Sequence, residues 1–208
     1  MPVDPTPPEN IPDEDVAAAL VAALEQEPDS AQLWIEYALW LAEIEDNHEK
    51  AEAALRRAVA TGREPWLSRM HLAMWLRERE GSLEEARDLL EQAISHEPED
   101  SFSHAALGDI LAEMGQLERA EDPYRKSLDL DPDNALAWCG LAQVFSAWHG
   151  DLDSAEQALD AAIEIDQDCA PAWIQMAELL SALPERAADA KAAQHRANLL
   201  MQAEGLVP

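Results

Sequence analysis

The sequence predicts an all-α protein made of five consecutive helix hairpins that stack into an α-solenoid. The stretch from Ser101 to Asn134 shows the unit: two amphipathic helical segments, separated by a turn at Gly115 and closed by Pro132. Glycine readily takes the positive φ that ends a helix, and proline cannot continue one. The pattern returns near residues 31, 66, 101, 135 and 170, at intervals of 35, 35, 34 and 35 residues. A regular period of this length is typical of stacked helical hairpins.

The apolar positions locate both helices of each hairpin. Each first helix carries a large residue, then a small one, then a second large residue three positions later. These sets are Tyr37-Ala38-Leu41, Leu72-Ala73-Leu76, Leu107-Gly108-Leu111, Leu141-Ala142-Phe145 and Met176-Ala177-Leu180. The second helices carry Ala51-Leu55-Ala58, Ala86-Leu90-Ala93, Ala120-Tyr124-Ser127, Ala155-Leu159-Ala162 and the weaker Ala190-Gln194-Ala197. The small residue lets the paired helix approach closely, and no sustained alternation supports β-structure.

The elements follow in order along the chain. Five prolines and no apolar periodicity in residues 1–13 predict a flexible leader. A helix from Glu14 to Pro28 matches the second helix of a repeat, so we expect a half-repeat at 14–30 that caps the solenoid. Full repeats are expected near 31–65, 66–100, 101–134, 135–169 and 170–204, in a single domain spanning 14–208. Ser82 and Glu85 predict a capping box, Pro123 falls inside a second helix, and the last helix is expected from Glu185 to about Ala203.

The chain resembles tetratricopeptide-repeat (TPR) proteins, including bacterial TPR adaptors, over roughly residues 14–204. The matching residues are Trp34, Trp138 and Trp173 at the fourth position of the repeat, Gly108 at the eighth, and Pro98 and Pro132 at the close. Arg69 and His104 replace the fourth-position Trp in the other two repeats. The resemblance implies a right-handed superhelix whose concave face binds peptides or partner proteins.

The charge is strongly negative. Forty-three acidic residues against fourteen Lys and Arg give a formal net charge of −29. The acids are spread along every repeat, which favours a solvated acidic surface, for example in a salt-rich environment, over a receptor for a basic partner. In either case a field of this sign repels phosphate backbones, so nucleic-acid binding is not expected.

The sequence contains no motif for catalysis, nucleotide binding or zinc binding. GxSxG, HExxH, GxxxxGK[ST] and Cys/His sets at zinc spacing are all absent. Cys139 and Cys169 fall in different predicted helices without a basic neighbour in sequence, and Cys139 is interpreted as a small apolar residue. We therefore expect no enzyme, no cofactor and no specific metal site.

The resemblance places the concave face at the second, fifth, ninth and twelfth positions of each first helix. The residues there that we expect to line a partner-binding groove are Ile35, Leu39, Leu67, Met70, Met74, Arg77, Phe102, Asp109, Cys139 and Gln143. An exposed apolar strip usually marks a partner site, and methionines adapt to varied side chains. The alternative is that superhelical packing buries these residues, or that the leader covers them. Ile35 and Leu39 stand where chaperone-tail-binding members carry Lys and Asn, so a chaperone tail is not the expected ligand.

The sequence favours a cytoplasmic, non-catalytic scaffold or adaptor for protein–protein interaction. The expected ligand is a protein or peptide segment with apolar anchors and basic flanks, and no stretch is apolar enough to span a membrane. Two alternatives stay open. Trp34-x-x-Tyr37-Ala38 also resembles a half-a-TPR (HAT) repeat, which would fit a subunit of an RNA-processing assembly. A self-assembling structural protein, whose solenoid ends stack into a homo-oligomer, is the other.

Overall fold

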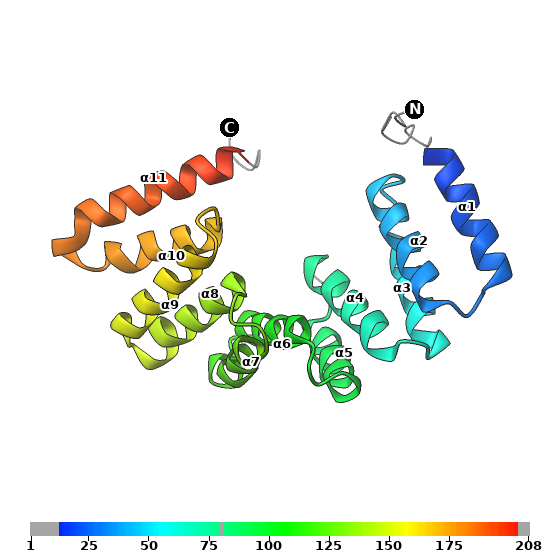
Figure 1. Cartoon of the computed structure of the whole chain (residues 1–208), viewed down its shortest axis with the longest axis horizontal. Helices are drawn as coiled ribbons and strands as arrows, with labels where there is room; N and C mark the ends of the chain where they lie inside the picture. The colour runs from blue at the N-terminus through cyan, green and yellow to red at the C-terminus, as the bar shows by residue number, and fades with distance from the viewer. Residues whose placement is uncertain (1–12, 80, 204–208) are drawn as a thin grey trace, which may run out of the picture. The chain divides into compact units, whose positions relative to one another are not determined.

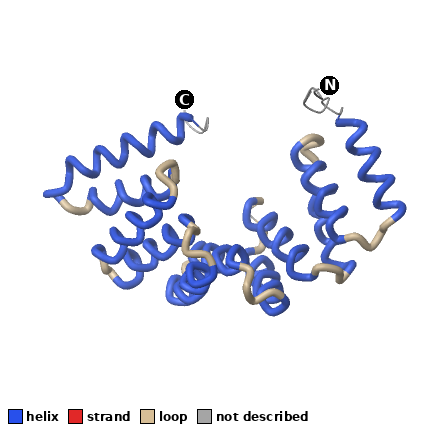
Figure 2. Tube along the Cα trace, in the orientation of Figure 1, coloured by secondary structure: helices blue, strands red, loops and turns tan. Residues whose placement is uncertain are grey.

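The computed structural model describes residues 13–79 and 81–203, and this part of the chain is all-helical. It contains eleven α-helices and no strand (Figures 1 and 2). The all-α solenoid of helix hairpins that the sequence predicts is therefore confirmed. The chain divides into two compact units, one ending at His96 and one beginning at Glu97. The repeat boundaries and the single domain stay predictions, and the expected leader lies outside the described residues except for Asp13, which opens the first helix.

The first unit contains five helices. They are α1 (Asp13–Gln26), α2 (Ala31–Glu43), α3 (His48–Thr61), α4 (Pro65–Glu78) and α5 (Leu83–His96). Helices α2 and α3 pair as one hairpin and α4 and α5 as the next, while α1 packs on α2. The two first helices, α2 and α4, also contact each other.

The second unit contains three hairpins. Their helices are α6 (Ser101–Glu113), α7 (Leu117–Leu130), α8 (Ala135–Val144), α9 (Leu152–Ile165), α10 (Ala170–Ser181) and α11 (Ala187–Ala203). A π-helical turn, Phe145–His149, continues α8, and a short 3-10 helix, Pro184–Arg186, precedes α11. The last helix was expected to start at Glu185, and this 3-10 segment moves its start to Ala187. The first helices α6, α8 and α10 pack side by side, α8 contacting both of the others.

Short polar side chains fix where the helices begin. At each of these N-caps an oxygen accepts the backbone N–H three residues later, which satisfies a donor that the helix itself leaves unpaired. The capping residues are Ser30, Asn47, Ser82, Asp100, Asn134 and Asp151. Ser82 makes its half of the predicted capping box at 3.1 Å, but the carboxylate of Glu85 turns away to Arg56.

The repeat alignment is visible in the packing. The small residues of the first helices are all buried, and so are the three marked residues of the second helices in the first four hairpins. In the fifth hairpin Gln194 is exposed, which agrees with its polar side chain at an otherwise apolar position. Pro123 lies inside α7 without interrupting it.

The fourth position of the repeat anchors the loop that precedes it. In three repeats a Trp indole N–H donates to the carbonyl oxygen six residues earlier: Trp34 to Pro28 at 2.9 Å, Trp138 to Pro132 at 3.0 Å, and Trp173 to Gln167 at 2.9 Å. His104 replaces Trp but keeps the contact, with Nε2 3.0 Å from the Pro98 oxygen. Arg69 does not, because its guanidinium donates to Pro65 within the same helix turn.

Candidate partner-binding surfaces

The structure distributes the predicted groove residues over both units. In the first unit Ile35 and Leu39 lie on α2, and Leu67, Met70, Met74 and Arg77 lie on α4, which contacts α2. In the second unit Phe102 and Asp109 lie on α6, and Cys139 and Gln143 lie on α8, which contacts α6. Each unit thus brings its own members onto neighbouring first helices, and a continuous strip over both units stays a prediction.

These residues differ in how much of each side chain a partner could reach. Ile35 and Cys139 retain 2% and 3% of their accessible surface, so they fill the space between helices. Leu39 and Phe102 are 42% and 49% exposed, and Gln143 is exposed as well. The other five are half-buried. Within the predicted set, Leu39 and Phe102 offer the most apolar surface.

Leu39 is part of an apolar groove between α1 and α2. The groove encloses about 370 Å³ and is lined by Val16 and Leu20 from α1 and by Glu36, Leu39, Trp40, Glu43 and Ile44 from and just after α2. Ile44 is 48% exposed. Glu36 and Glu43 lie on either side of Leu39 along α2, and none of the described residues that line the groove is basic. This combination suits an apolar ligand that carries positive charge at its edges.

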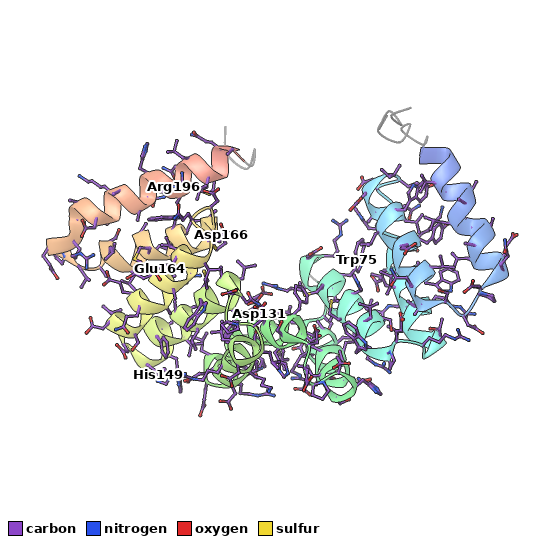
Figure 3. The ribbon with its side chains drawn as sticks, in the orientation of Figure 1. Trp75, Asp131, His149, Glu164, Asp166 and Arg196 are labelled. Atoms are coloured by element: carbon purple, nitrogen blue, oxygen red, sulfur yellow. The ribbon has the colours of Figure 1, made fainter. Side chains whose placement is uncertain are left out.

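A second hollow adjoins α1 and shares Trp40 with the first. It encloses about 550 Å³ and is lined by Ala17, Ala18, Val21, Ala22, Glu25, Tyr37, Trp40 and Glu45. The rings of Tyr37 and Trp40 stack with centroids 6.3 Å apart. The indole N–H of Trp40 is buried and has no hydrogen-bond partner among the described residues. Trp75, which Figure 3 labels, holds the equivalent position of the next repeat. It packs instead against His48.

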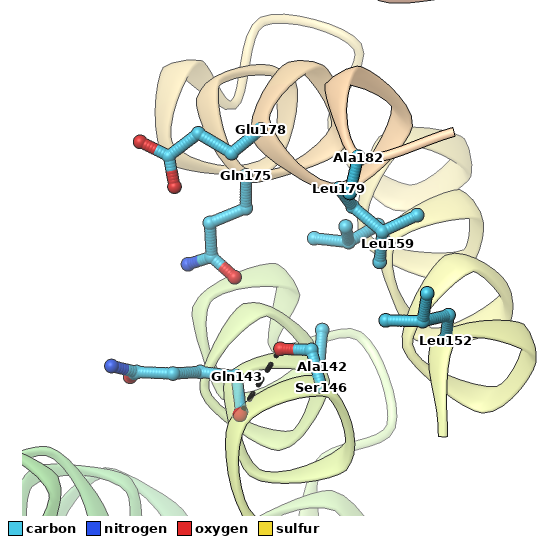
Figure 4. A pocket seen from close by; sticks show the side chains of 9 residues that line it. All are labelled: Ala142, Gln143, Ser146, Leu152, Leu159, Gln175, Glu178, Leu179 and Ala182. Atoms are coloured by element: carbon cyan, nitrogen blue, oxygen red, sulfur yellow. Dashed lines mark hydrogen bonds between the residues drawn. The ribbon is translucent and has the colours of Figure 1, made fainter. Parts of the chain in front are cut away.

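The second unit holds a pocket of about 260 Å³ between α8 and α10 (Figure 4). Leu152, Leu159 and Leu179 give it an apolar wall, and Gln143, Gln175 and Glu178 supply its polar groups. The hydroxyl of Ser146 donates to the Gln143 carbonyl at 3.2 Å, so it is already engaged within the helix. Amide side chains beside an apolar wall can bind a peptide backbone while a partner side chain enters the pocket.

Ion pairs between the few basic residues and nearby carboxylates leave the net charge of −29 unchanged. Arg56 donates to both carboxylate oxygens of Glu85, at 2.6 and 3.1 Å, which joins α3 to α5. Its hydrogen bonds lower the pKa of Glu85. Along α9, by contrast, burial and the charges of Glu156 and Glu164 raise the pKa of Asp160. Crowded carboxylates of this kind make a basic partner electrostatically favourable.

The last two hairpins form one more hollow. It encloses about 540 Å³ and is lined by Ile163, Glu164, Gln167, Trp173, Ala192 and Arg196. Figure 3 labels Glu164, Asp166 and Arg196 at this end of the second unit. Arg196 donates to Asp168 and to the Gln167 carbonyl, so its charge is paired.

Across 13–79 and 81–203, no group of three His, Cys, Asp or Glu side chains is arranged to hold a metal ion. None of the helices described combines the length and the apolar character that crossing a bilayer requires.

Sequence reasoning missed the contribution of α1 to the first groove. The sequence predicts that the helix in 14–30 caps the solenoid, and the i, i+4 spacing of Val16 and Leu20 shows only that they share a side of this helix. It does not show that part of that side stays open beside α2.

Comparison with known proteins supports the repeat assignment. Residues 108–147 match a family model described as "TPR repeat", and residues 79–122 match one described as "Tetratricopeptide repeat". No curated protein matches the sequence.

Solved structures share the fold at low sequence identity. YrrB, described as "a TPR protein with an unusual peptide-binding site", is 21% identical, with 89% of this chain and 94% of that one covered and a TM-score of 0.65. The pilF protein of Pseudomonas aeruginosa is 20% identical over 92% and 83% of the two chains, with a TM-score of 0.73. A MamA fragment from Desulfovibrio magneticus RS-1 is 15% identical over 84% and 94%, with a TM-score of 0.64.

Proposed function

Because the chain is a tetratricopeptide-repeat protein, we propose that it works as a non-catalytic scaffold that binds a segment of a partner protein. Helical repeats of this class present extended surfaces to other proteins, and interaction is the role that the fold suggests. The bound segment has apolar anchors and basic flanks. This segment binds in the groove between α1 and α2.

The observation that carries this proposal is the exposed apolar surface at that groove. Of the large apolar side chains more than 40% exposed in the described part of the first unit, Leu39 and Ile44 line this groove and Val21 lines the adjoining hollow. Exposed apolar side chains that gather in one place, rather than scatter singly, mark interaction sites. YrrB supports the same reading, since its description names a peptide-binding site.

The apolar anchors and the basic flanks contribute differently to binding. Covering the exposed part of Leu39 or Ile44 contributes about 1 kcal/mol for each, since full burial of such a side chain yields roughly 1.5–3 kcal/mol. Each basic flank beside Glu36 or Glu43 adds only about 0.2–1 kcal/mol because these carboxylates are exposed. With a net charge of −29, the flanks act mainly on the association rate and its salt dependence.

The experiment compares two substitutions of the same chemistry. Leu39→Glu places a charge in the groove, whereas Leu136→Glu places one at a 59% exposed leucine of α8 that is not among the residues lining the groove. We expect a partner retained from lysate by the wild type and Leu136→Glu to be lost from Leu39→Glu, with circular dichroism showing that both variants fold. Equal retention by all three would remove the groove from the proposal.

Identifying the bound segment completes the test. A photo-crosslinking residue at position 43, beside the groove, is expected to capture a stretch with apolar residues next to Lys or Arg. Binding of that stretch as a synthetic peptide should weaken as salt rises. Capture of an acidic stretch would contradict the expected partner chemistry.

The two alternatives predict different results. Self-assembly through the apolar face of α1 would give a molar mass that rises with concentration in light scattering, although the charge opposes it. A subunit that contacts RNA directly would bind RNA in solution, and the negative charge of the protein opposes such binding.

A further inference from the structure

Helix α1 resembles the second helix of a hairpin, yet no described helix precedes it. It contains 14 residues, as do α3, α5, α7 and α9, the second helices of the first four hairpins. Each of those four packs on the first helix of its own hairpin, and α3, α7 and α9 also pack on the first helix that follows. Helix α1 makes the second of these contacts, with α2. The first helix that would pair with it is absent from residues 13–79 and 81–203.

One apolar side of α1 lacks the cover that its counterparts have. Val16, Leu20 and Ala23 are the fourth, eighth and eleventh residues of α1, and their spacing places them on one side of the helix. The residues at these three positions are buried in α3, α5, α7 and α9. In α1 all three are half-buried. A neighbour that buries this side in the complete hairpins is therefore missing at α1.

Tyr124 shows what covers this side in a complete hairpin. It is the eighth residue of α7, as Leu20 is of α1. Its ring lies against Gly108 in α6, the first helix of its own hairpin, and against Gly140 in α8, the first helix of the next. Leu20 has the second kind of neighbour, since it lines the groove together with residues of α2. The first kind would come from a helix in the place that α6 holds beside α7.

The wall that α2 contributes to the groove differs in the same way from its counterparts. Trp40 stands at the tenth position of the repeat, as Trp75, Val144 and Leu179 do in α4, α8 and α10. Those three helices each contact the first helix of the preceding hairpin, and the three side chains are buried. Trp40 is half-buried, and no first helix precedes α2 among the described residues. An additional first helix would thus cover both walls of the groove.

We propose that the partner segment binds in this groove as an amphipathic α-helix, which takes the place of the missing first helix and completes a hairpin with α1. The inference rests on the proposed function and adds the conformation of the bound segment. Such a helix needs about three and a half turns, since α2 and α6 have 13 residues. It carries a small residue next to large apolar ones, as the first helices of this chain do, and lies with that side against α1.

The charge and the sequence favour a helix from another protein. Glu36 and Glu43 line the groove, and none of the described residues that line it is basic, so Lys or Arg at the borders of the helix would be attracted. A second copy of this chain carries the same net charge of −29, and its described first helices are already paired in hairpins. Residues 1–12 contain five prolines, which are too many for a helix of this length.

The probe is a synthetic peptide with the sequence of residues 65–79, which form α4 and the residue after it. It contains the first-helix pattern Leu72-Ala73-Leu76, and its three arginines and one glutamate give it a net positive charge. We expect saturable binding to the full chain by fluorescence anisotropy. The same peptide with Leu72→Pro keeps the charge but cannot form the helix, and we expect it to bind about a hundredfold more weakly. Equal binding of the two peptides, or binding of neither, would overturn the inference.

Two variants of the full chain locate the bound peptide. Leu39→Glu and Leu20→Glu put a charge on the α2 wall and on the α1 wall of the groove, and each should weaken binding of the peptide by about tenfold or more. Leu136→Glu is the matched control and should bind as the wild type does. If Leu20→Glu unfolds α1 by circular dichroism, Leu39→Glu decides alone, since Leu39 is 42% exposed. Hydrogen exchange should slow in α1 when the peptide is added, because the helix gains a neighbour. Full affinity of Leu39→Glu, or protection confined to other helices, would contradict binding in this groove.

The natural segment separates the inference from the proposed function. The stretch captured at position 43 is synthesised with and without a proline at its centre. We expect the unsubstituted peptide to gain helical circular dichroism on binding and the proline variant to bind about a hundredfold more weakly. Equal binding of the two would rule out the helix and leave the scaffold function in place. Retention of the partner by Leu39→Glu would instead count against the groove itself, whatever the conformation of the bound segment.

Discussion

The ring of Tyr124 occupies the space in which a side chain at Gly140 would begin. A Cβ on Gly140 would lie 2.2 Å from ring atom Cζ and 2.7 Å from the hydroxyl oxygen. The same ring covers Gly108 on α6, where a Cβ would lie 2.6 Å from Cε1. Tyr124 is 1% exposed, and its hydroxyl donates to Asp109 at 2.8 Å, so the ring is held in place from both ends.

We expect Gly140→Ala to destabilise the protein by about 1–3 kcal/mol, the usual cost of overpacking a core. The substitution would otherwise gain about 1 kcal/mol of helix propensity, so the sign of the change is informative. Urea denaturation measures it. Tyr124→Leu in the same chain should relieve the clash, which makes the double variant more stable than the two separate losses imply. A stabilised Gly140→Ala variant would show that the ring can move.

The ion pair between Arg56 and Glu85 gives a prediction on pH. Hydrogen bonds from Arg56 lower the pKa of Glu85 from its usual 4.5. A depressed carboxyl pKa stabilises the folded state above the unfolded pKa, and this contribution is lost as the pH falls through the folded pKa. We expect Glu85→Gln to cost less than about 1 kcal/mol at neutral pH, because the pair is exposed.

The difference between wild type and Glu85→Gln should then shrink below pH 4.5. Chemical denaturation at a series of pH values follows it. Glu99→Gln, an exposed carboxylate in the loop before α6, is the matched control for the change in net charge. A difference that grows as the pH falls would contradict the assigned ion pair.

The loop anchor at the fourth position of the repeat can be tested with Trp138→Phe. This variant keeps an aromatic ring but loses the donor to the Pro132 carbonyl, and we expect a loss of about 1 kcal/mol from the hydrogen bond. Trp148→Phe is the control, since Trp148 is 52% exposed on the following turn. Equal effects in urea denaturation would mean that ring size, not the bond, matters at position 138.

The contribution of one side-chain oxygen to stability can be tested at the N-cap of α9. Asp151 accepts the backbone N–H of Ser154 at 3.0 Å, and Asp151→Ala should lower the free energy of unfolding by about 1 kcal/mol. Asp151→Asn keeps an acceptor at the same place and should cost much less. Thermal or urea denaturation of the pair separates capping from charge, because a loss of equal size in both variants would point to charge alone.

The sequence predicts the helical repeat, but it does not predict which side chains on the helices are exposed. Ala73, Gly108 and Ala142 revealed the hairpins because each must be small for two helices to approach, whatever the neighbouring repeat does. Exposure depends on the neighbour. Ile35 and Leu39 are four residues apart on one helix, yet one is buried and the other is 42% exposed. Helical spacing cannot distinguish them, since the difference depends on how the neighbouring helices α1, α3 and α4 lie against α2.

The cysteines illustrate the same limit. Each was assessed with its own neighbours in sequence, and neither has a basic residue close by. Their burial in one core depends on how α8 and α10 stack, which neither residue's neighbours in sequence reveal.

The anchor at the fourth position also decides where the chain can accept foreign sequence. The bond from Trp138 to Pro132 spans a fixed six residues, as do those of Trp34, His104 and Trp173, so a longer connection between hairpins would break it. The turn inside a hairpin is freer: Gly115 is exposed, and no atom lies within 4 Å of where its Cβ would be. An epitope tag or a fluorescent reporter is therefore best inserted at Gly115, and a graft between Pro132 and Trp138 is expected to unfold the hairpin that follows.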